Sequence, residues 1–179
     1  MKQIAIVIAL CVGAWYFFVG GRKLDEQMVR EHYRQGARAA AANDADRLCK
    51  QLSRKVVMDI SATVMGKTEK GSFNRDEACD AFRKTTETMR EIKSHAGAIL
   101  SVDYDYHIDS IEIAPDRRSA LVKGTTVMSI GDTAFQLKTS FNQRLESELG
   151  QTRLVHAEDY IVLRLGGRGT MSQSDFFRK

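Results

Sequence analysis

The sequence has no block of like charges, and this argues against one class of partner. Its 27 lysines and arginines are interleaved with 23 acidic residues, for a net charge of +4. Removing residues 1–21 takes away only Lys2, so the remainder carries 26 basic and 23 acidic side chains, or +3. A nucleic-acid-binding surface needs its basic residues concentrated on one face. We therefore expect no nucleic-acid partner.

Several signatures of catalysis and cofactor binding are also missing. No serine stands in a G-x-S-x-G nucleophile elbow. The glycines of LGGRG, residues 165–169, follow a predicted strand with no helix behind them, so they do not form a phosphate-binding loop. The acidic segment NDADR, residues 43–47, lacks the pattern of a calcium-binding loop. We expect no cofactor, and the chain has no internal repeat.

The one long apolar run lies at the N-terminus. Residues 4–21, IAIVIALCVGAWYFFVGG, carry no charge and have basic residues on both sides. At a rise of about 1.5 Å per residue, such a run is just long enough to cross the core of a bilayer. A cleaved signal peptide usually has a shorter apolar stretch and a small-x-small exit. Here the run closes with AWYFFVGG, in which aromatic residues precede the weak processing site Val19-Gly20-Gly21. Lipoprotein processing at Cys11 would need a small residue where Leu10 stands.

An uncleaved anchor is therefore the favoured interpretation of residues 4–21, and a cleaved signal peptide is the alternative. A short N-terminal tail stays inside more readily than a large domain does, so we expect the domain to be exported. The predicted location is the bacterial inner membrane, with the domain in the periplasm. The predicted organisation is a transmembrane signal-anchor over residues 1–21, one domain over residues 22–165 and a flexible, Gly- and Ser-rich tail over residues 166–179.

Cysteine is scarce, with three in the chain. Cys11 falls in the apolar run, which leaves Cys49 and Cys79 in the exported domain. In an oxidising compartment these two can form a disulfide. The alternative is a pair of small buried thiols, since both occupy apolar positions of predicted helices. Both alternatives stay open, because the sequence does not supply the Cα–Cα distance.

Apolar residues at three- and four-residue steps predict a helix over residues 24–42 and a shorter one over residues 45–52, with Asp44 or Asn43 as its N-cap. A third helix begins after Asn74, because Glu77 completes a capping box. It ends near Gly97. Its predicted buried face is Ala78, Phe82, Thr85, Met89 and Ile92.

The remaining segments alternate as strands do. Residues 55–65 predict a strand or part of a hairpin, and GKTEKGS after it predicts a turn-rich connection. Four further strands, joined by short turns, predict an antiparallel meander. These strands cover residues 99–113, 119–130, 133–145 and 152–165.

This order of elements resembles the nuclear transport factor 2-like, or SnoaL-like, superfamily over residues 24–165. The stretches AAAANDADRLCKQLSRKVVMD and GSFNRDEACDAF carry the resemblance. The resemblance implies an α+β fold, in which a cone-shaped, curved antiparallel sheet packs on about three helices behind the transmembrane helix. The superfamily includes isomerases, dehydratases, transport factors and assembly domains, so the fold does not decide the function.

The stretch ILSVDYDYHIDSIEI, residues 99–113, offers four candidate metal ligands in a row, Asp103, Asp105, His107 and Asp109. Alternation sends these four to the face of the sheet opposite the helices. Neighbours on one face are about 6–7 Å apart, so all four cannot share one ion. We expect a solvated or partner-facing stripe and no metal site. A bulge near Asp109 or Ser110 would return Ile111 and Ile113 to the core.

Asp159 is the candidate for a pocket. It shares its phase with Val155, Ala157 and Ile161, and a carboxylate on a core-facing phase is costly unless it is paired, protonated or wet. In the resembled enzymes, a pocket acid beside a tyrosine or histidine moves a proton. The alternative is a purely structural acceptor. The other pocket candidates are Tyr104, Tyr106, Thr126, Met128, Thr139 and Phe141.

We expect a binding or interaction protein and no enzyme. The expected partner is another protein of the cell envelope, which docks on the sheet face or the cone mouth; the face could also form a homodimer. An immunity-type inhibitor of a toxin and an accessory component of a secretion machine are two versions of this function. The alternative is a small-molecule enzyme or ligand-binding protein that uses the cone cavity for isomerase- or dehydratase-like proton transfer.

Overall fold

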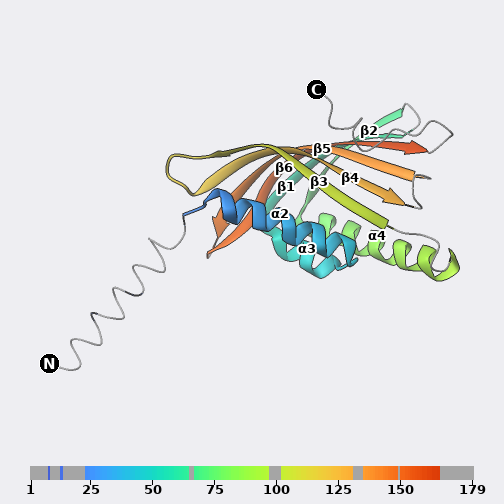
Figure 1. The fold of residues 1–179 in the computed structure, drawn as a ribbon, viewed down its shortest axis with the longest axis horizontal. Coiled ribbons are helices and arrows are strands. Elements are labelled where there is room, and N and C mark those ends of the chain that lie inside the picture. The colour runs from blue at the N-terminus through green and yellow to red at the C-terminus, as the bar shows by residue number, and fades with distance from the viewer. Residues whose placement is uncertain are drawn as a thin grey trace.

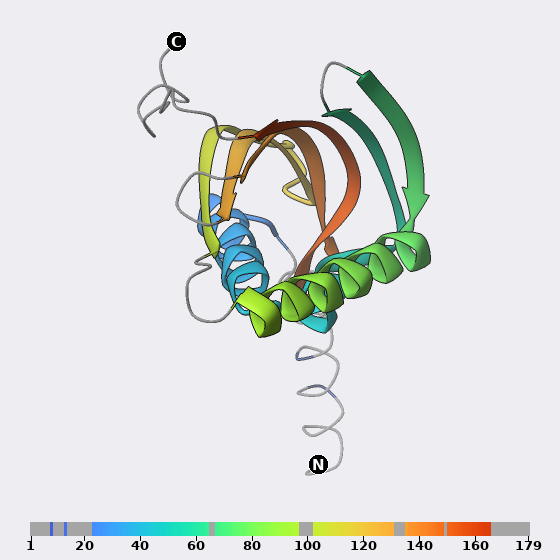
Figure 2. The ribbon, with the colours of Figure 1, turned by 90° about the vertical axis from the view of Figure 1, so that its right-hand side faces the viewer.

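The computed structural model describes Ile8, Gly13 and residues 23–64, 67–96, 102–130, 135–148 and 150–165. Within these ranges the elements follow in the order α2, α3, β1, β2, α4, β3, β4, β5, β6. The six strands form one curved sheet, and the three helices lie along its concave side (Figures 1 and 2). The predicted α+β architecture is confirmed.

Two short helices open the described domain, and each begins at an aspartate cap. In α2, Glu26–Ala41, the side chain of Asp25 accepts a hydrogen bond of 2.8 Å from the Met28 backbone N–H. In α3, Ala45–Gln51, Asp44 accepts one of 3.0 Å from the Arg47 N–H, so Asp44 is the predicted cap. These bonds satisfy backbone donors that a helix start otherwise leaves open.

Helix α4, Arg75–Ala96, starts in the predicted capping box. Asn74 Oδ1 accepts from the Glu77 N–H at 3.1 Å, and Glu77 Oε2 accepts from the Asn74 N–H at 2.9 Å. Of the predicted buried face, Ala78 is buried and Phe82 and Met89 are partly buried, whereas Thr85 is exposed and Thr86 is buried in its place. The side chain of Ile92 lies outside the described part of the chain. Cys79 is held inward by its disulfide, and this turns the buried face towards Thr86, whose hydroxyl donates to the Phe82 carbonyl at 2.8 Å.

Within the segment GKTEKGS, residues 67–72 belong to a strand and not to a turn-rich connection. Strand β1, Leu52–Val64, pairs antiparallel with β2, Lys67–Asn74, from Val64↔Lys67 to Val57↔Asn74. Strand β2 lies at one edge of the sheet, and most of its side chains are exposed. Polar residues and a glycine are therefore tolerated in β2. Because these residues have low strand propensity, the sequence pattern does not predict this strand.

The predicted meander is confirmed. Its strands are β3, Val102–Ile113, β4, Ser119–Ile130, β5, Phe135–Glu148, and β6, Gln151–Leu165. They lie side by side in chain order, and the three neighbouring pairs are antiparallel. The sheet is nevertheless mixed, because β6 pairs parallel with β1 in the order β2-β1-β6-β5-β4-β3. Helix α4 carries the chain to the far edge of the sheet, and the meander then returns its last strand beside β1.

Strand β3 bends at the predicted place. Its register with β4 shifts between Ile108 and Ser110, which leaves Asp109 as the extra residue. Beyond this bulge Ile111 and Ile113 pack against the core. The bulge therefore lets one strand keep apolar residues inside on both sides of a phase change.

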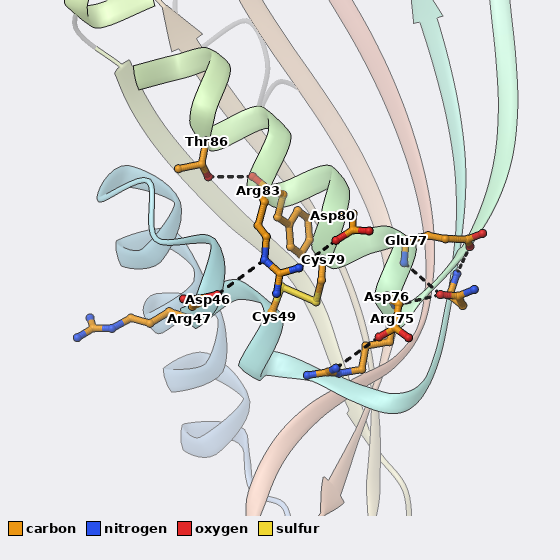
Figure 3. The surroundings of a disulfide bond; sticks show 12 residues. Asp46, Arg47, Cys49, Arg75, Asp76, Glu77, Cys79, Asp80, Arg83 and Thr86 are labelled. Atoms are coloured by element: carbon orange, nitrogen blue, oxygen red, sulfur yellow. Dashed lines mark hydrogen bonds and ion pairs between the residues drawn. A yellow bond between two sulfur atoms is a disulfide. The ribbon is translucent and has the colours of Figure 1, made fainter. Parts of the chain in front are cut away.

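The core fills the space between the concave side of the sheet and the helices. Its largest fully buried apolar side chains are Leu24, Val29, Val56, Val122 and Leu145. A disulfide between Cys49 of α3 and Cys79 of α4 crosses the helical layer, with the two Cα atoms 5.3 Å apart (Figure 3). It closes a loop of 30 positions in the sequence.

Among the described residues, no helix is both long and apolar enough to span a membrane. Apart from Ile8 and Gly13, the apolar run 4–21 lies outside those residues, and so does the predicted tail 166–179. The anchor, the tail and the domain boundaries at residues 21 and 165 stay predictions.

Candidate functional site

The carboxylate of Asp159 lies inside the curve of the sheet. Its residue is 9 % exposed, and it pairs across the sheet with Phe141 on β5. Gln143, two residues along β5, donates from Nε2 to Asp159 Oδ1 at 3.0 Å. Burial raises the pKa of Asp159 above its usual range, and the hydrogen bond from Gln143 opposes this rise. The sheet thus holds a carboxylate whose charged form is disfavoured.

Gln143 joins this carboxylate to helix α2. Its Oε1 accepts a hydrogen bond of 2.9 Å from the Tyr33 hydroxyl, while its Nε2 serves Asp159. Both polar atoms of one amide are therefore used: Tyr33 donates to Gln143, and Gln143 donates to Asp159. Burial, with Asp159 as a nearby negative charge, raises the pKa of Tyr33, so this hydroxyl remains a donor.

The ring of Tyr33 occupies the interior of the cone. It stacks on Phe141 with ring centroids 5.3 Å apart and on Tyr106 with centroids 6.3 Å apart. The ring planes lie within 18° and 25° of parallel. Helix α2 thus delivers an aromatic side chain to the concave side of the sheet.

Gly124 on β4 makes room for the ring of Phe141. A Cβ atom built on Gly124 would lie 2.5 Å from Phe141 Cζ and 2.3 Å from the His107 carbonyl oxygen. Both distances are shorter than any tolerated contact, and the carbonyl belongs to the backbone and cannot move aside. The sheet therefore needs a glycine here in order to close over the stacked rings.

Tyr104 lies on β3 two residues before Tyr106 and on the same concave face of the sheet. Burial raises its pKa, a hydrogen bond with Thr126 opposes the rise, and the charge of Asp159 acts with burial. Thr126 pairs with Tyr106 on one side and with Thr139 on the other, and Met128 pairs with Tyr104.

All seven pocket candidates thus share the concave face. Three of them, Tyr106, Phe141 and Asp159, meet around Tyr33 and Gln143. The side chains of Tyr104 and Thr126 are joined by a hydrogen bond. Thr139 pairs with Thr126 and Met128 with Leu137 on the neighbouring rungs of the sheet.

Two residues at the centre of this site, Tyr33 and Gln143, were not among the candidates. Gln143 has the same phase on β5 as Phe141, so alternation could have found it. Tyr33 lies on the inward face of its helix, but its partner is 110 positions away. No local pattern identifies a contact of that range.

The acidic stripe lies where alternation places it. Asp103, Asp105, His107 and Asp109 are exposed on the opposite face, on β3, which forms the edge of the sheet away from β2. His107 Nε2 and Asp109 Oδ1 are 3.6 Å apart. No group of three or more candidate metal ligands occurs among the described residues.

The same outer face carries exposed apolar side chains on the inner strands. Tyr160 and Val162 of β6 are 58 % and 38 % exposed, and Val57 of β1 is 43 % exposed. Tyr160 lies beside Ser61 and Val162 beside Thr63, whereas Val57 is further along, beside His156. We call Tyr160, Val162 and Val57 the outer patch.

Comparison with known proteins gives a fold and no family. No protein-family profile and no curated protein matches the chain. A conserved protein from Planctomyces limnophilus is 14 % identical, with a TM-score of 0.59 over 78 % of this chain and 98 % of that one. An NTF-2 like protein of unknown function from Shewanella oneidensis is 14 % identical, with a TM-score of 0.54 over 75 % and 97 %. LinA is 9 % identical, with a TM-score of 0.56 over 82 % and 92 %.

The chain has the nuclear transport factor 2-like fold. At these identities the likeness extends to the fold alone, so the function has to be argued from the side chains of this chain.

Proposed function

We propose that the protein is a membrane-anchored binding protein of the bacterial periplasm, and that it docks another envelope protein on the outer patch. One observation carries the proposal, namely that the cone interior is occupied by the chain's own Tyr33. Its ring stacks on Phe141 and Tyr106, and its hydroxyl is bound to Gln143. The interior is arranged as a core, while the outer face keeps apolar side chains in water.

The arrangement around Asp159 favours binding over catalysis. A general base must reach the proton that it removes. Here Oδ1 of Asp159 accepts a hydrogen bond from the Gln143 amide, and that amide accepts one from the Tyr33 hydroxyl. A substrate would have to displace the Tyr33 ring before it met the carboxylate. The proposed function is therefore binding and not catalysis.

The exported location draws support from two features. Residues 4–21 have the length and the apolar character of an anchor. The Cys49–Cys79 disulfide is buried in the helical layer, and disulfides persist in oxidising compartments such as the periplasm. Carbonate extraction followed by intact-mass measurement tests this part, with the uncleaved chain expected in the membrane pellet. A soluble mature form that starts after Gly21 contradicts the anchor.

The outer patch suits a protein partner. Exposed apolar side chains rimmed by polar ones are typical of protein–protein contact sites. Glu158 and His156 flank the patch on β6, and the acidic stripe lies across the same face on β3. An immunity-type inhibitor or an accessory component of an envelope machine would use such a face, and the chemistry favours a partner with an apolar centre and basic edges.

A photo-crosslinking residue at position 160 tests the docking face in intact cells. The expected result is one discrete adduct in the envelope that a Val162→Lys change removes, with no adduct from the same residue at position 76 on α4. The partner, once purified, should bind the parent at least about tenfold more tightly than the Val162→Lys variant. An adduct of twice the chain's mass identifies a homodimer, and an adduct that survives Val162→Lys contradicts the proposed face.

The second candidate, ligand binding inside the cone, rests on a separate observation. Asp159 is a buried carboxylate with a raised pKa, and Tyr104 and Tyr33 lie near enough to feel its charge. Such environments occur at functional sites. If Tyr33 swings out, the acid and the two tyrosines would line one cavity. The Asp159 variants in the Discussion separate this candidate from the first.

A further inference from the structure

A second concave region lies at the end of the sheet where the chain enters the domain. It is a groove of about 870 Å³ between the end of α3, the start of β1, the first residue of α4 and the turn from β5 to β6. Five of its lining residues are cationic, and we call it the basic groove. These residues are Lys50, Arg54, Lys55, Arg75 and Arg153.

The groove exists because β1 leaves its partner for a short distance. Leu52 pairs with Leu154 and Val57 pairs with His156, so residues 53–56 of β1 lie opposite Val155 alone. Four residues against one force the backbone of β1 away from β6. Arg54 and Lys55 belong to this segment and are exposed.

The acids near the groove pair with two of its five cations: Lys55 lies 2.6 Å from Glu146, and Arg75 lies 3.7 Å from Asp76. Glu148 is the one acidic lining residue, and its Oε1 accepts from the buried Ser53 hydroxyl at 2.6 Å. Glu146 bonds with both Lys55 and Arg144, and these two cations hold its pKa below the usual range. Among the described residues, Lys50, Arg54 and Arg153 form no ion pair of the kind that Lys55 makes.

Two polar atoms in the wall point to a ligand with oxygen acceptors. Arg75 Nε and Ser147 Oγ are buried and have no hydrogen-bond partner within the described part of the chain. A buried donor without an acceptor is costly, and an anionic oxygen would satisfy a guanidinium N–H and a hydroxyl together.

The groove adjoins the point where the N-terminal run is attached. The backbone N–H of Ser147, a wall residue, donates to the Arg118 carbonyl at 3.0 Å. The next residue back, Arg117, holds Leu24 by two hydrogen bonds, of 2.6 Å to its N–H and of 3.1 Å to its carbonyl. Leu24 is fully buried and lies three positions after the last residue of the run 4–21. An anchor in the bilayer would therefore hold this end of the domain at the headgroups.

We propose that the basic groove binds the phosphate groups of anionic phospholipids and so docks the entry end of the domain on the membrane. The choice of lipid as the ligand rests on the proposed anchor. Clusters of about four to eight lysines and arginines next to a membrane segment bind anionic headgroups by charge. The groove supplies five, with Arg117 and Arg118 beside them.

Amine labelling of the full chain in vesicles tests the groove. The chain is reconstituted in phosphatidylcholine with and without phosphatidylglycerol, and acetylation of each lysine is followed by mass spectrometry. In the anionic vesicles, labelling of Lys50 and Lys55 should slow by about fivefold or more, the factor contributed by one charge near an anionic surface. Lys84 on α4 should label equally in both, and added salt should restore labelling of the groove.

Charge reversal supplies the matched control. In a Lys50→Glu, Arg54→Glu variant the protection of Lys55 should be lost. A Lys67→Glu, Lys70→Glu variant, with the same change in net charge on β2, should keep it. Circular dichroism melts check that both variants fold, since all four side chains are exposed.

Each outcome decides one part. A chain that floats with both kinds of vesicle but shows equal labelling of Lys55 overturns the groove alone. A chain that fails to float with phosphatidylcholine overturns the anchor, and with it lipid as the ligand. Equal protection by inorganic phosphate in detergent assigns the groove to a soluble anion and overturns the lipid.

Discussion

Tyr33 of α2 and Gln143 of β5 are 110 positions apart in the sequence, and a hydrogen bond of 2.9 Å joins them inside the cone. A helix is thereby attached to the middle of the sheet by a polar contact as well as by packing. Because Gln143 also donates to Asp159, the loss of Tyr33 would free an amide that orients a buried acid.

A Tyr33→Phe change tests this contact. The ring and its stacking on Phe141 remain, while Gln143 Oε1 loses its donor. We expect the free energy of unfolding to fall by about 1–2 kcal/mol. The matched change Tyr160→Phe, on an exposed side chain, should move it by only a few tenths of a kcal/mol. Urea unfolding measures both, and equal effects would contradict the proposed role of the interior hydroxyl.

Two substitutions of Asp159 separate a structural acid from a ligand site. Asp159→Asn keeps an oxygen for Gln143 and should be tolerated. Asp159→Leu strands the Gln143 donor and should cost about 1–3 kcal/mol, read as a lower melting temperature. A Leu variant more stable than the parent would favour the ligand-pocket function, because binding sites sacrifice stability to keep costly polar groups.

Local patterns predicted much of the concave face. Alternation along β6 sent Asp159 inward, and the misphased Ile111 and Ile113 required a bulge, which occurs at Asp109. The capping box at Asn74 fixed the start of α4. Each of these features depends on residues a few positions apart, so a short window of the sequence is enough to predict it.

The remaining features depend on pairing between distant segments. Strand β2 has a polar sequence and is a strand because β1 lies beside it. The parallel contact of β1 with β6 follows from the path of the whole chain. The contact between Tyr33 and Gln143 needs the curvature of the complete sheet, and no window of the sequence contains that curvature.

Gly124→Ala should destabilise the sheet. The new methyl group would meet the His107 carbonyl oxygen and the ring of Phe141 at distances that require movement of β3 or of the stack. We expect a loss of about 1–3 kcal/mol in chemical denaturation. Gly36→Ala on α2 is the control, because there the nearest atom is the flexible end of Gln51 and alanine favours the helix. If both variants match the parent, the close approach at Gly124 has no energetic weight.

The disulfide should contribute strongly to stability. It closes a loop of 30 positions, and the entropy lost by the unfolded chain corresponds to about 3–4 kcal/mol. Nearby surface pairs add little, since Arg83 bridges Asp80 and Asp46 from exposed positions (Figure 3). We expect a Cys49→Ala, Cys79→Ala variant to lose most of that amount. In the parent, a thiol reagent under denaturing conditions should modify neither cysteine until a reductant is added; labelling before reduction would rule the bond out.

The last prediction concerns pH and His32. This side chain lies on α2, and its Nδ1–H donates to the Thr152 carbonyl at 3.1 Å. Burial lowers the pKa of His32 from 6.5 to about 4, Arg153 acts in the same direction, and the hydrogen bond to Thr152 opposes them. The unfolded chain therefore binds a proton on His32 below pH 6.5, whereas the folded chain does not until about pH 4.

Stability is consequently lost as the pH falls through this window, by up to about 2–3 kcal/mol from His32. Asp159 acts in the opposite sense, because its raised pKa keeps the folded acid protonated while the unfolded one ionises above 3.8, so its contribution to stability falls as the pH rises. We expect His32→Gln, which can still donate to Thr152, to flatten the acid side of the stability profile. Urea unfolding at a series of pH values measures it, with His107→Gln on the exposed outer face as the control. A His32→Gln variant with the parent's acid slope would show that other groups cause it.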